Sequence, residues 1–139
     1  MAGKIIVLSA PSGSRKSTII SHLIKNEDLN LGFSISATSR PPRGNEQNGR
    51  EYFFLTPQEF KNKVENEEFI EWEEVYQDVC YGTLESEVKR ITESGKNLVM
   101  DVDVKGALSI KSKYGNKVLT LFIMPWSVQI FIQSDLYHM

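Results

Sequence analysis

Near the N-terminus, residues that suit phosphate binding follow an apolar run at 5–8. A short polar loop comes directly after this run and contains Ala10, Pro11, Ser12, Gly13, Ser14 and Arg15. Lys16, Ser17 and Thr18 then open a helical pattern, and a strand, loop and helix in this order direct backbone N–H groups at one place. The Lys16 ammonium would hold β- and γ-phosphates there, and the Ser17 hydroxyl would bind Mg²⁺.

This loop departs twice from the usual phosphate-binding pattern, which has glycine where Ala10 and Arg15 stand. One methyl group costs little where the local φ is negative, so Ala10 is a mild change. Arg15 is more serious, because a glycine lets the backbone adopt otherwise strained torsions close to the phosphates. The alternative is a turn rich in Ser and Lys with no ligand, but the rest of the chain favours the phosphate site.

A second group of residues that could hold a phosphate lies at 36–43, where Arg40 and Arg43 flank two prolines. Two guanidinium groups on a stiff segment can bind one phosphate from two sides, and Tyr52 would add a hydroxyl donor. The alternative is a solvated loop with two surface arginines. On this segment alone, that alternative is the better interpretation.

Glu71, Tyr81 and Thr83 could together recognise a purine base. A carboxylate that accepts two parallel hydrogen bonds suits guanine, whose N1–H and 2-amino group lie side by side, and adenine lacks that pair. A threonine hydroxyl can donate to the guanine O6 on the same edge. In isolation, Glu71 would more often be a surface residue of a strand.

Asp101 and Asp103 follow the buried-type strand expected at 97–102. Carboxylates at the C-terminal end of a parallel strand lie where α/β sheets bind their ligands, and near a triphosphate they can orient Mg²⁺ and its waters. The alternative is that Asp103 caps a helix at its N-terminus. Both interpretations can hold together.

The elements that must position these residues alternate between strands and helices, which predicts an α/β fold with a parallel sheet. Strands are expected at 5–8, 33–38, 97–102 and 117–123, and helices from 16, from 84 and from 104. Gly95 is expected to end the helix that begins near residue 84.

The middle of the chain does not show this regular alternation, and short strands are expected there at 52–55, 69–72 and 80–83. Between them, Thr56, Pro57 and Glu59 form the signature of a capped helix that runs to about residue 65. Short strands close together predict a small mixed sheet inserted into the α/β core. The apolar stretch at 126–132 has no clear period, and no element is predicted there.

Composition excludes several classes of function for this chain of 139 residues. A net charge of −2 gives no electrostatic footprint for nucleic acid or an anionic membrane. The apolar run at 5–8 is too short for a signal peptide or a membrane span. Cys80 is the sole cysteine, so no intrachain disulfide is possible and a reducing cytoplasm is the simplest compartment. The two histidines, His22 and His138, are far apart and lack Cys or His neighbours at metal-binding spacing, so no zinc site is expected. The sequence does not predict the oligomeric state.

In combination, these segments resemble the guanylate kinase family in its bacterial version. The resemblance covers residue 3 to about Pro125 and rests on motifs found in order. The motifs are Ala-Pro-Ser-Gly at 10–13, Ser-Ala-Thr-Ser-Arg-Pro-Pro-Arg-Gly at 36–44, Gly-Arg-Glu-Tyr-Phe-Phe at 49–54, Glu-Phe-Ile-Glu-Trp at 68–72, Tyr-Gly-Thr at 81–83 and Asp-Val-Asp at 101–103.

The resemblance implies transfer of a phosphoryl group from ATP to GMP with Mg²⁺, giving ADP and GDP. It implies that residues 10–18 bind ATP and that Ser17 and Asp101 serve the metal. Lys16, Arg40 and Asp101 are the implied catalytic residues. The implied GMP-binding residues are Ser36, Arg40, Arg43, Tyr52, Glu71, Tyr81, Thr83 and Asp103.

The same resemblance divides the chain into parts. Residues 1–34 and 84–125 would form a P-loop nucleoside monophosphate kinase core. Residues 35–83 would form a GMP-binding subdomain that closes over the core during turnover. Residues 126–139 would be a tail outside the family, either truncated or out of frame, with the lid and the last core elements missing.

Two departures from the family pattern predict impaired activity. Arg15 alters the phosphate loop, and arginines of the lid are absent after Pro125. Such an arginine can be worth ~10³–10⁵ in rate. The alternatives are a catalytically weak binding module for GMP or a phosphorylated partner, and a nonfunctional product with an unstable fold. Retention of Lys16, Ser17 and the two aspartates favours the enzyme.

Overall fold

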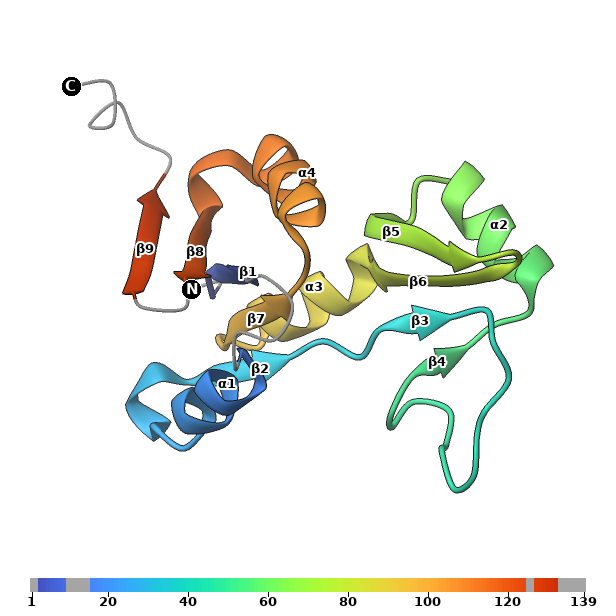
Figure 1. Cartoon of the computed structure of the whole chain (residues 1–139), viewed down its shortest axis with the longest axis horizontal. Coiled ribbons are helices and arrows are strands. Elements are labelled where there is room, and N and C mark those ends of the chain that lie inside the picture. The colour runs from blue at the N-terminus through green and yellow to red at the C-terminus, as the bar shows by residue number, and fades with distance from the viewer. Residues whose placement is uncertain (1–2, 10–15, 125–126, 133–139) are drawn as a thin grey trace. The chain divides into compact units, whose positions relative to one another are not determined.

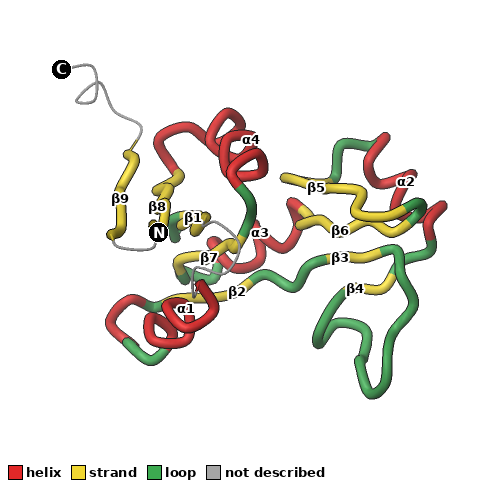
Figure 2. The backbone as a smooth tube through the Cα atoms, in the orientation of Figure 1, coloured by secondary structure: helices red, strands yellow, loops and turns green. Residues whose placement is uncertain are grey.

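The computed structural model describes residues 3–9, 16–124 and 127–132. The chain divides into two compact units (Figures 1 and 2). The first unit comprises Met1–Phe33 and Ile91–Met139, and the second is Ser34–Arg90. The division falls within helix α3 (Glu85–Glu93), slightly later than the boundary expected at residue 84.

The first unit is built on a five-stranded sheet in the order β2-β7-β1-β8-β9. Its strands are β1 (Ile5–Ser9), β2 (Leu31–Phe33), β7 (Asn97–Asp101), β8 (Val118–Met124) and β9 (Ser127–Ile132). The first four pair in parallel, as the alternation of strands and helices predicts. Only β9 runs antiparallel, against β8.

Helices cover this sheet and explain the apolar character of its strands. Helix α1 (Lys16–Ile24) packs side chains from its apolar stripe against a cluster of Leu8, Val99 and Ile123. Helix α4 (Val104–Tyr114) buries Ala107 and Ile110 and contacts β1 and β8. Burial between helices is why the strands read as continuous apolar runs instead of alternating patterns.

The second unit contains the small mixed sheet expected from the middle of the sequence. Its strands are β3 (Ala37–Thr38), β4 (Phe53–Phe54), β5 (Phe69–Tyr76) and β6 (Val79–Leu84), in the order β4-β3-β6-β5. Strands β3 and β4 are parallel, whereas β6 pairs antiparallel with both β3 and β5. The α/β class with a parallel core and a separate mixed sheet is confirmed.

Helix α2 (Pro57–Glu65) packs on this small sheet and carries the predicted capping box. The Thr56 hydroxyl accepts from the backbone N–H of Glu59, and the Glu59 carboxylate accepts from the backbone N–H of Thr56. Phe60 points from α2 into the core, where its ring stacks on Phe69 at 4.4 Å between centroids. Helix α2 therefore covers one face of the small sheet and packs its core against β5.

The structure corrects two predictions about strands. Residues 33–38 were expected to form one strand, but β2 ends at Phe33 and β3 begins at Ala37. The two strands pair in different sheets, so the chain must leave one before it joins the other. No element was predicted near the C-terminus, where β9 lies at the sheet edge. In β9, polar Ser127 and Gln129 alternate with Val128, but 130–132 is continuously apolar, so period 2 does not extend over the strand.

Two short 3₁₀ helices lie at Glu27–Leu29 and Gly115–Lys117, just before β2 and β8 respectively. Helix α3 ends before Gly95, whose φ of +90° is the left-handed conformation that glycine tolerates best. Within the described part of the chain, no helix is long and apolar enough to cross a membrane.

Candidate active site

Arg40 is the centre of a buried polar cluster in the second unit and is only 6% exposed. Its guanidinium donates to both carboxylate oxygens of Glu46, at 2.7 and 3.0 Å. Its Nε donates to the Tyr81 hydroxyl at 3.1 Å. The Arg40 guanidinium also donates to the Pro41 carbonyl at 3.0 Å, so most of its donors are in use. These bonds fix its position, and a phosphate that bound it in a bidentate way would have to displace Glu46.

Aromatic rings enclose the same guanidinium. Its central carbon lies 5.0 Å from the centre of the Tyr52 ring and 5.8 Å from that of Phe54. The Tyr52 and Tyr81 rings are 5.8 Å apart. Cation–π contacts of this kind stabilise a charge away from water. Three residues predicted to bind GMP, Arg40, Tyr52 and Tyr81, are thus brought together.

Glu46 belongs to this cluster and was missed by the sequence analysis. Besides the two bonds from Arg40, its carboxylate accepts from the backbone N–H of Arg43 at 2.8 Å. These hydrogen bonds, that from Arg40 first, lower the Glu46 pKa from 4.5 to about 2. The signal available in the sequence was an acidic residue three positions after Arg43, in a loop otherwise poor in acids.

The lowered pKa of Glu46 predicts a pH-dependent stability. A carboxylate whose folded pKa is depressed stabilises the fold above its unfolded pKa, and this contribution is lost as the pH falls through the folded value. We expect the free energy of unfolding to fall between pH 4.5 and pH 2. Glu46→Gln should be less stable at pH 7 and should show a shallower decline in urea unfolding across that window. A decline as steep as that of the parent would show that Glu46 is not responsible.

Glu71 and Thr83 face each other across β5 and β6, and the Thr83 hydroxyl donates to the Glu71 carboxylate at 2.9 Å. Both residues were predicted to contact guanine, and the structure places them in one cross-strand pair. Gly82, the residue before Thr83, faces the other side of the sheet and lets β5 and β6 approach closely there. A side chain there would lie 2.7 Å from the Glu71 carbonyl oxygen and 2.8 Å from the Phe69 ring.

The Arg40 cluster and the Glu71–Thr83 pair share one face of the sheet. Tyr81 and Thr83 are alternate residues of β6, and side chains of alternate strand residues point the same way. Ser36 lies just before β3 and is half-buried, and its carbonyl accepts from Phe53 at 2.9 Å. Arg43 is exposed and contributes a backbone N–H to Glu46.

The first unit holds the residues predicted to bind ATP. Residues 10–15 of the loop lie outside the described ranges. Lys16 begins helix α1, so Ser17 and Thr18 follow in its first turn. Asp101 ends β7, in register with Leu8 of β1, so it lies beside the strand that leads into the loop.

Asp103 caps helix α4, because its carboxylate accepts from the backbone N–H of Gly106 at 2.7 Å. The alternative interpretation of Asp103 as a helix cap is therefore confirmed. A role toward nucleotide stays a prediction.

The donors near the phosphate loop fit magnesium in their chemistry. Mg²⁺ prefers oxygen ligands and keeps several waters, so a hydroxyl from Ser17 and a carboxylate from Asp101 would suffice beside phosphate oxygens. No group of three or more His, Cys, Asp or Glu residues that could hold a metal alone is found among the described residues. A metal held jointly with a nucleotide is consistent with that finding.

A parallel sheet covered by helices, and a separate mixed sheet that carries the Arg40 cluster, define an α/β protein of two units. The sequence model of the "Guanylate kinase" family matches residues 2–135. The chain belongs to the guanylate kinase family. The match continues through residue 135, beyond Pro125, where the resemblance seen in the sequence was placed to end.

Individual relatives agree with this assignment. The chain is 59% identical over 126 residues to the guanylate kinase of Porphyromonas gingivalis, covering 91% of this chain and 67% of the relative. It is 57% identical over 129 residues to that of Bacteroides thetaiotaomicron, covering 93% and 63%. The crystal structure of guanylate kinase from Anaplasma phagocytophilum matches with a TM-score of 0.67 and 30% identity, covering 88% and 60%. The chain thus spans about two thirds or less of the length of these relatives.

Proposed function

We propose that this chain acts in the transfer of the γ-phosphoryl group of ATP to GMP, giving ADP and GDP. The observation that carries the proposal is the single sheet face on which Arg40 and the Glu71–Thr83 pair lie. It offers a cationic end for a phosphate and a carboxylate–hydroxyl end for guanine. Family membership supports the same acceptor.

At the phosphate end, Arg40 and Arg43 would contact phosphate oxygens, with hydroxyl donors from Tyr52 and Tyr81. The Glu46 carboxylate already accepts the two guanidinium bonds of Arg40 that a phosphate would take. Phosphate binding therefore competes with, or rearranges, this ion pair. The guanidinium keeps its charge throughout, because Glu46 and Tyr81 raise its pKa further.

At the base end, the Glu71 carboxylate would accept from the N1–H and 2-amino group of guanine. The Thr83 hydroxyl now donates to Glu71, and it would turn to donate to the guanine O6. Ser36 would add a further contact. Discrimination against adenine follows, because adenine would leave the carboxylate without its two donors.

At the donor end, residues 10–18 would bind the ATP phosphates through backbone N–H groups, the Lys16 ammonium and the Ser17 and Thr18 hydroxyls. Bound Mg²⁺ would neutralise charge on the phosphates, and Ser17 and Asp101 would hold it. Lys16, Arg40 and Asp101 are the residues we propose as catalytic. Asp103 would assist in placing GMP.

The proposed activity is tested by coupled detection of ADP formed from ATP and GMP. The chain should be compared with Arg15→Gly and with an Arg15→Gly form extended by the C-terminal third of a full-length relative. We expect the rate to rise with each change, because the glycine permits close backbone approach to the phosphates and the added segment supplies arginines that can neutralise their charge. If the folded, extended Arg15→Gly protein forms no ADP, the proposal is wrong.

A second candidate, a binding module for GMP or a phosphorylated partner, is favoured by one observation. The Arg40 cluster is complete, whereas the loop for ATP carries Arg15 in place of glycine. This candidate predicts GMP binding with no ADP formation in any of the three proteins. A cytoplasmic location suits both candidates, since Cys80 is the sole cysteine.

Replacing Glu71 with glutamine is expected to weaken GMP binding about 10- to 100-fold, because one charge-assisted acceptor is lost. AMP binding should change little, so the preference for GMP over AMP should shrink. Glu73→Gln, on the same strand and exposed, is the matched control and should leave both affinities unchanged. Calorimetry with both nucleotides measures this. An unchanged preference in Glu71→Gln would remove this residue from the guanine site.

A further inference from the structure

A cavity lies against strands β5 and β6, on the face opposite to Glu71 and Thr83. Across these strands Glu71 pairs with Thr83, and Glu74 pairs with Cys80. Glu71 and Glu74 are three positions apart, so their side chains leave opposite faces of the sheet. The cavity has a volume of about 190 Å³ and lies between the sheet and helix α2.

One end of this cavity is apolar. Phe60 and Val64 line it from α2, and Trp72 lines it from β5. Phe60 is buried, but Trp72 remains 46% exposed, and their rings meet edge to face at 6.3 Å between centroids. A half-exposed tryptophan at the wall of a cavity offers a ring face to a ligand.

The other end is acidic and has a fixed backbone. Glu74 and Asp78 line it, and the Glu74 carboxylate accepts from the backbone N–H of Asp78 at 3.2 Å. Ser39 ties the hairpin in place, since its hydroxyl donates to the Asp78 carbonyl at 2.7 Å and accepts from the Cys80 N–H at 2.8 Å. Lys61 also lines the cavity, from the exposed side of α2, so the two carboxylates outnumber the cations in its lining.

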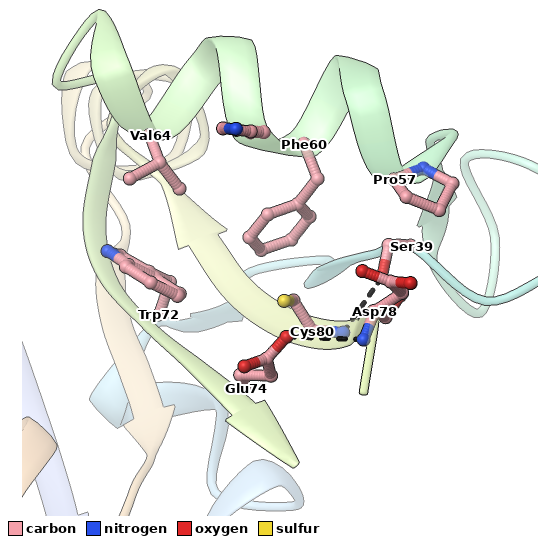
Figure 3. A pocket seen from close by; sticks show the side chains of 9 residues that line it. Ser39, Pro57, Phe60, Val64, Trp72, Glu74, Asp78 and Cys80 are labelled. Atoms are coloured by element: carbon pink, nitrogen blue, oxygen red, sulfur yellow. Dashed lines mark hydrogen bonds between the residues drawn. The ribbon is translucent and has the colours of Figure 1, made fainter. Parts of the chain in front are cut away.

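The Cys80 thiol lies between the two ends, beneath Phe60 (Figure 3). Burial raises its pKa, and the charges of Glu74 and Asp78 raise it further. The negative field of the two carboxylates therefore reaches into the cavity as far as the sulfur. Glu74 and Asp78 are exposed, so a cation entering the cavity would meet an attractive field that solvent partly screens.

We propose that this cavity is a second ligand site, for a small organic cation whose aromatic or aliphatic body lies against Phe60 and Trp72 and whose ammonium lies toward Glu74 and Asp78. The exposed part of the Trp72 ring would pack against the body of such a ligand. The site is independent of the proposed kinase function, because it uses the other face of the sheet.

The rate at which iodoacetamide alkylates Cys80 tests this site, since no other cysteine is present to react. The probe is 2-phenylethylammonium, and 2-phenylethanol is its neutral counterpart. We expect the ammonium to slow alkylation saturably, by about tenfold or more, and the alcohol to protect at least several-fold less at equal concentration. Glu74→Gln should abolish the difference between the two, whereas Glu73→Gln, on the other face, should preserve it.

Amide chemical shifts of Asp78 and Cys80 should move with the same saturation curve, which ties the protection to this cavity. Saturating GMP should leave the protection unchanged. Absence of protection by the ammonium in the folded protein, or equal protection by the alcohol, would overturn the proposal. Loss of protection in the presence of GMP would show that the two faces do not act as separate sites and would overturn it as well.

Discussion

Replacing Arg40 with alanine is expected to weaken GMP binding about 100-fold, because truncating one partner of a buried, hydrogen-bonded charge pair costs about 2–5 kcal/mol of binding free energy. The side chain is nearly buried and is held in place by Tyr81 and two aromatic rings, and the phosphate would take the two guanidinium bonds that Glu46 accepts in the free protein. Guanosine, which lacks the phosphate, should bind Arg40→Ala as it binds the parent. Calorimetry with GMP and guanosine separates the two ends of the site.

Two further variants sharpen this result. Arg40→Lys keeps the charge but loses the fork of donors, so it should recover only a small part of the lost affinity. Arg50→Ala removes an exposed arginine of the same loop, one that pairs with Glu51, and should leave GMP affinity unchanged. If Arg40→Ala weakened guanosine as much as GMP, the phosphate would be bound elsewhere.

Replacing Phe60 with alanine is expected to destabilise the second unit by roughly 3–5 kcal/mol, the usual cost of removing a buried phenylalanine. Phe60 is 2% exposed and stacks on Phe69, so its loss leaves a void between α2 and the sheet. Because β5 and β6 carry Glu71, Tyr81 and Thr83, GMP binding should fail at the same denaturant concentration at which this unit unfolds.

Chemical denaturation followed by circular dichroism measures this loss. Tyr76→Ala is the control, because Tyr76 is an aromatic residue of β5 in the same unit that is 72% exposed, and its loss should cost on the order of 0.5 kcal/mol or less. Phe60→Leu should fall between the two, at about 1 kcal/mol, and it keeps the test open if Phe60→Ala does not fold. Equal stability of the parent and Phe60→Leu would show that this core does not hold the unit.

Local chemistry made much of this fold predictable. The start of α2 could be predicted because Thr56 and Glu59, three positions apart, cap the helix through hydrogen bonds to each other's backbone, with Pro57 at the first helical position. Continuous apolar runs marked β1 and β7 because helices bury both sheet faces. The prediction of one strand at 33–38 was wrong, because the chain changes sheets after Phe33. That change depends on pairing with strands far away in the sequence, and no local pattern indicates it.

In the candidate site, too, residues marked by local chemistry could be predicted, and contacts that depend on the folded chain could not. Arg40, Tyr52, Glu71 and Thr83 could be selected from side-chain chemistry and family motifs, although the roles assigned to them stay predictions. Glu46 could not, because its importance depends on reaching back to Arg40 across a loop. The cavity beside Cys80 also escaped prediction, since it forms only when α2 packs over β5 and β6.

The central claim is that the sheet face carrying Arg40 and Glu71 binds GMP by both its phosphate and its base. The measurement that tests this most directly is calorimetric titration of the unaltered chain with GMP, AMP and guanosine under identical conditions. The account predicts that GMP binds at least about tenfold more tightly than either AMP, which lacks the guanine edge, or guanosine, which lacks the phosphate. Equal affinity for GMP and AMP, or for GMP and guanosine, would contradict it.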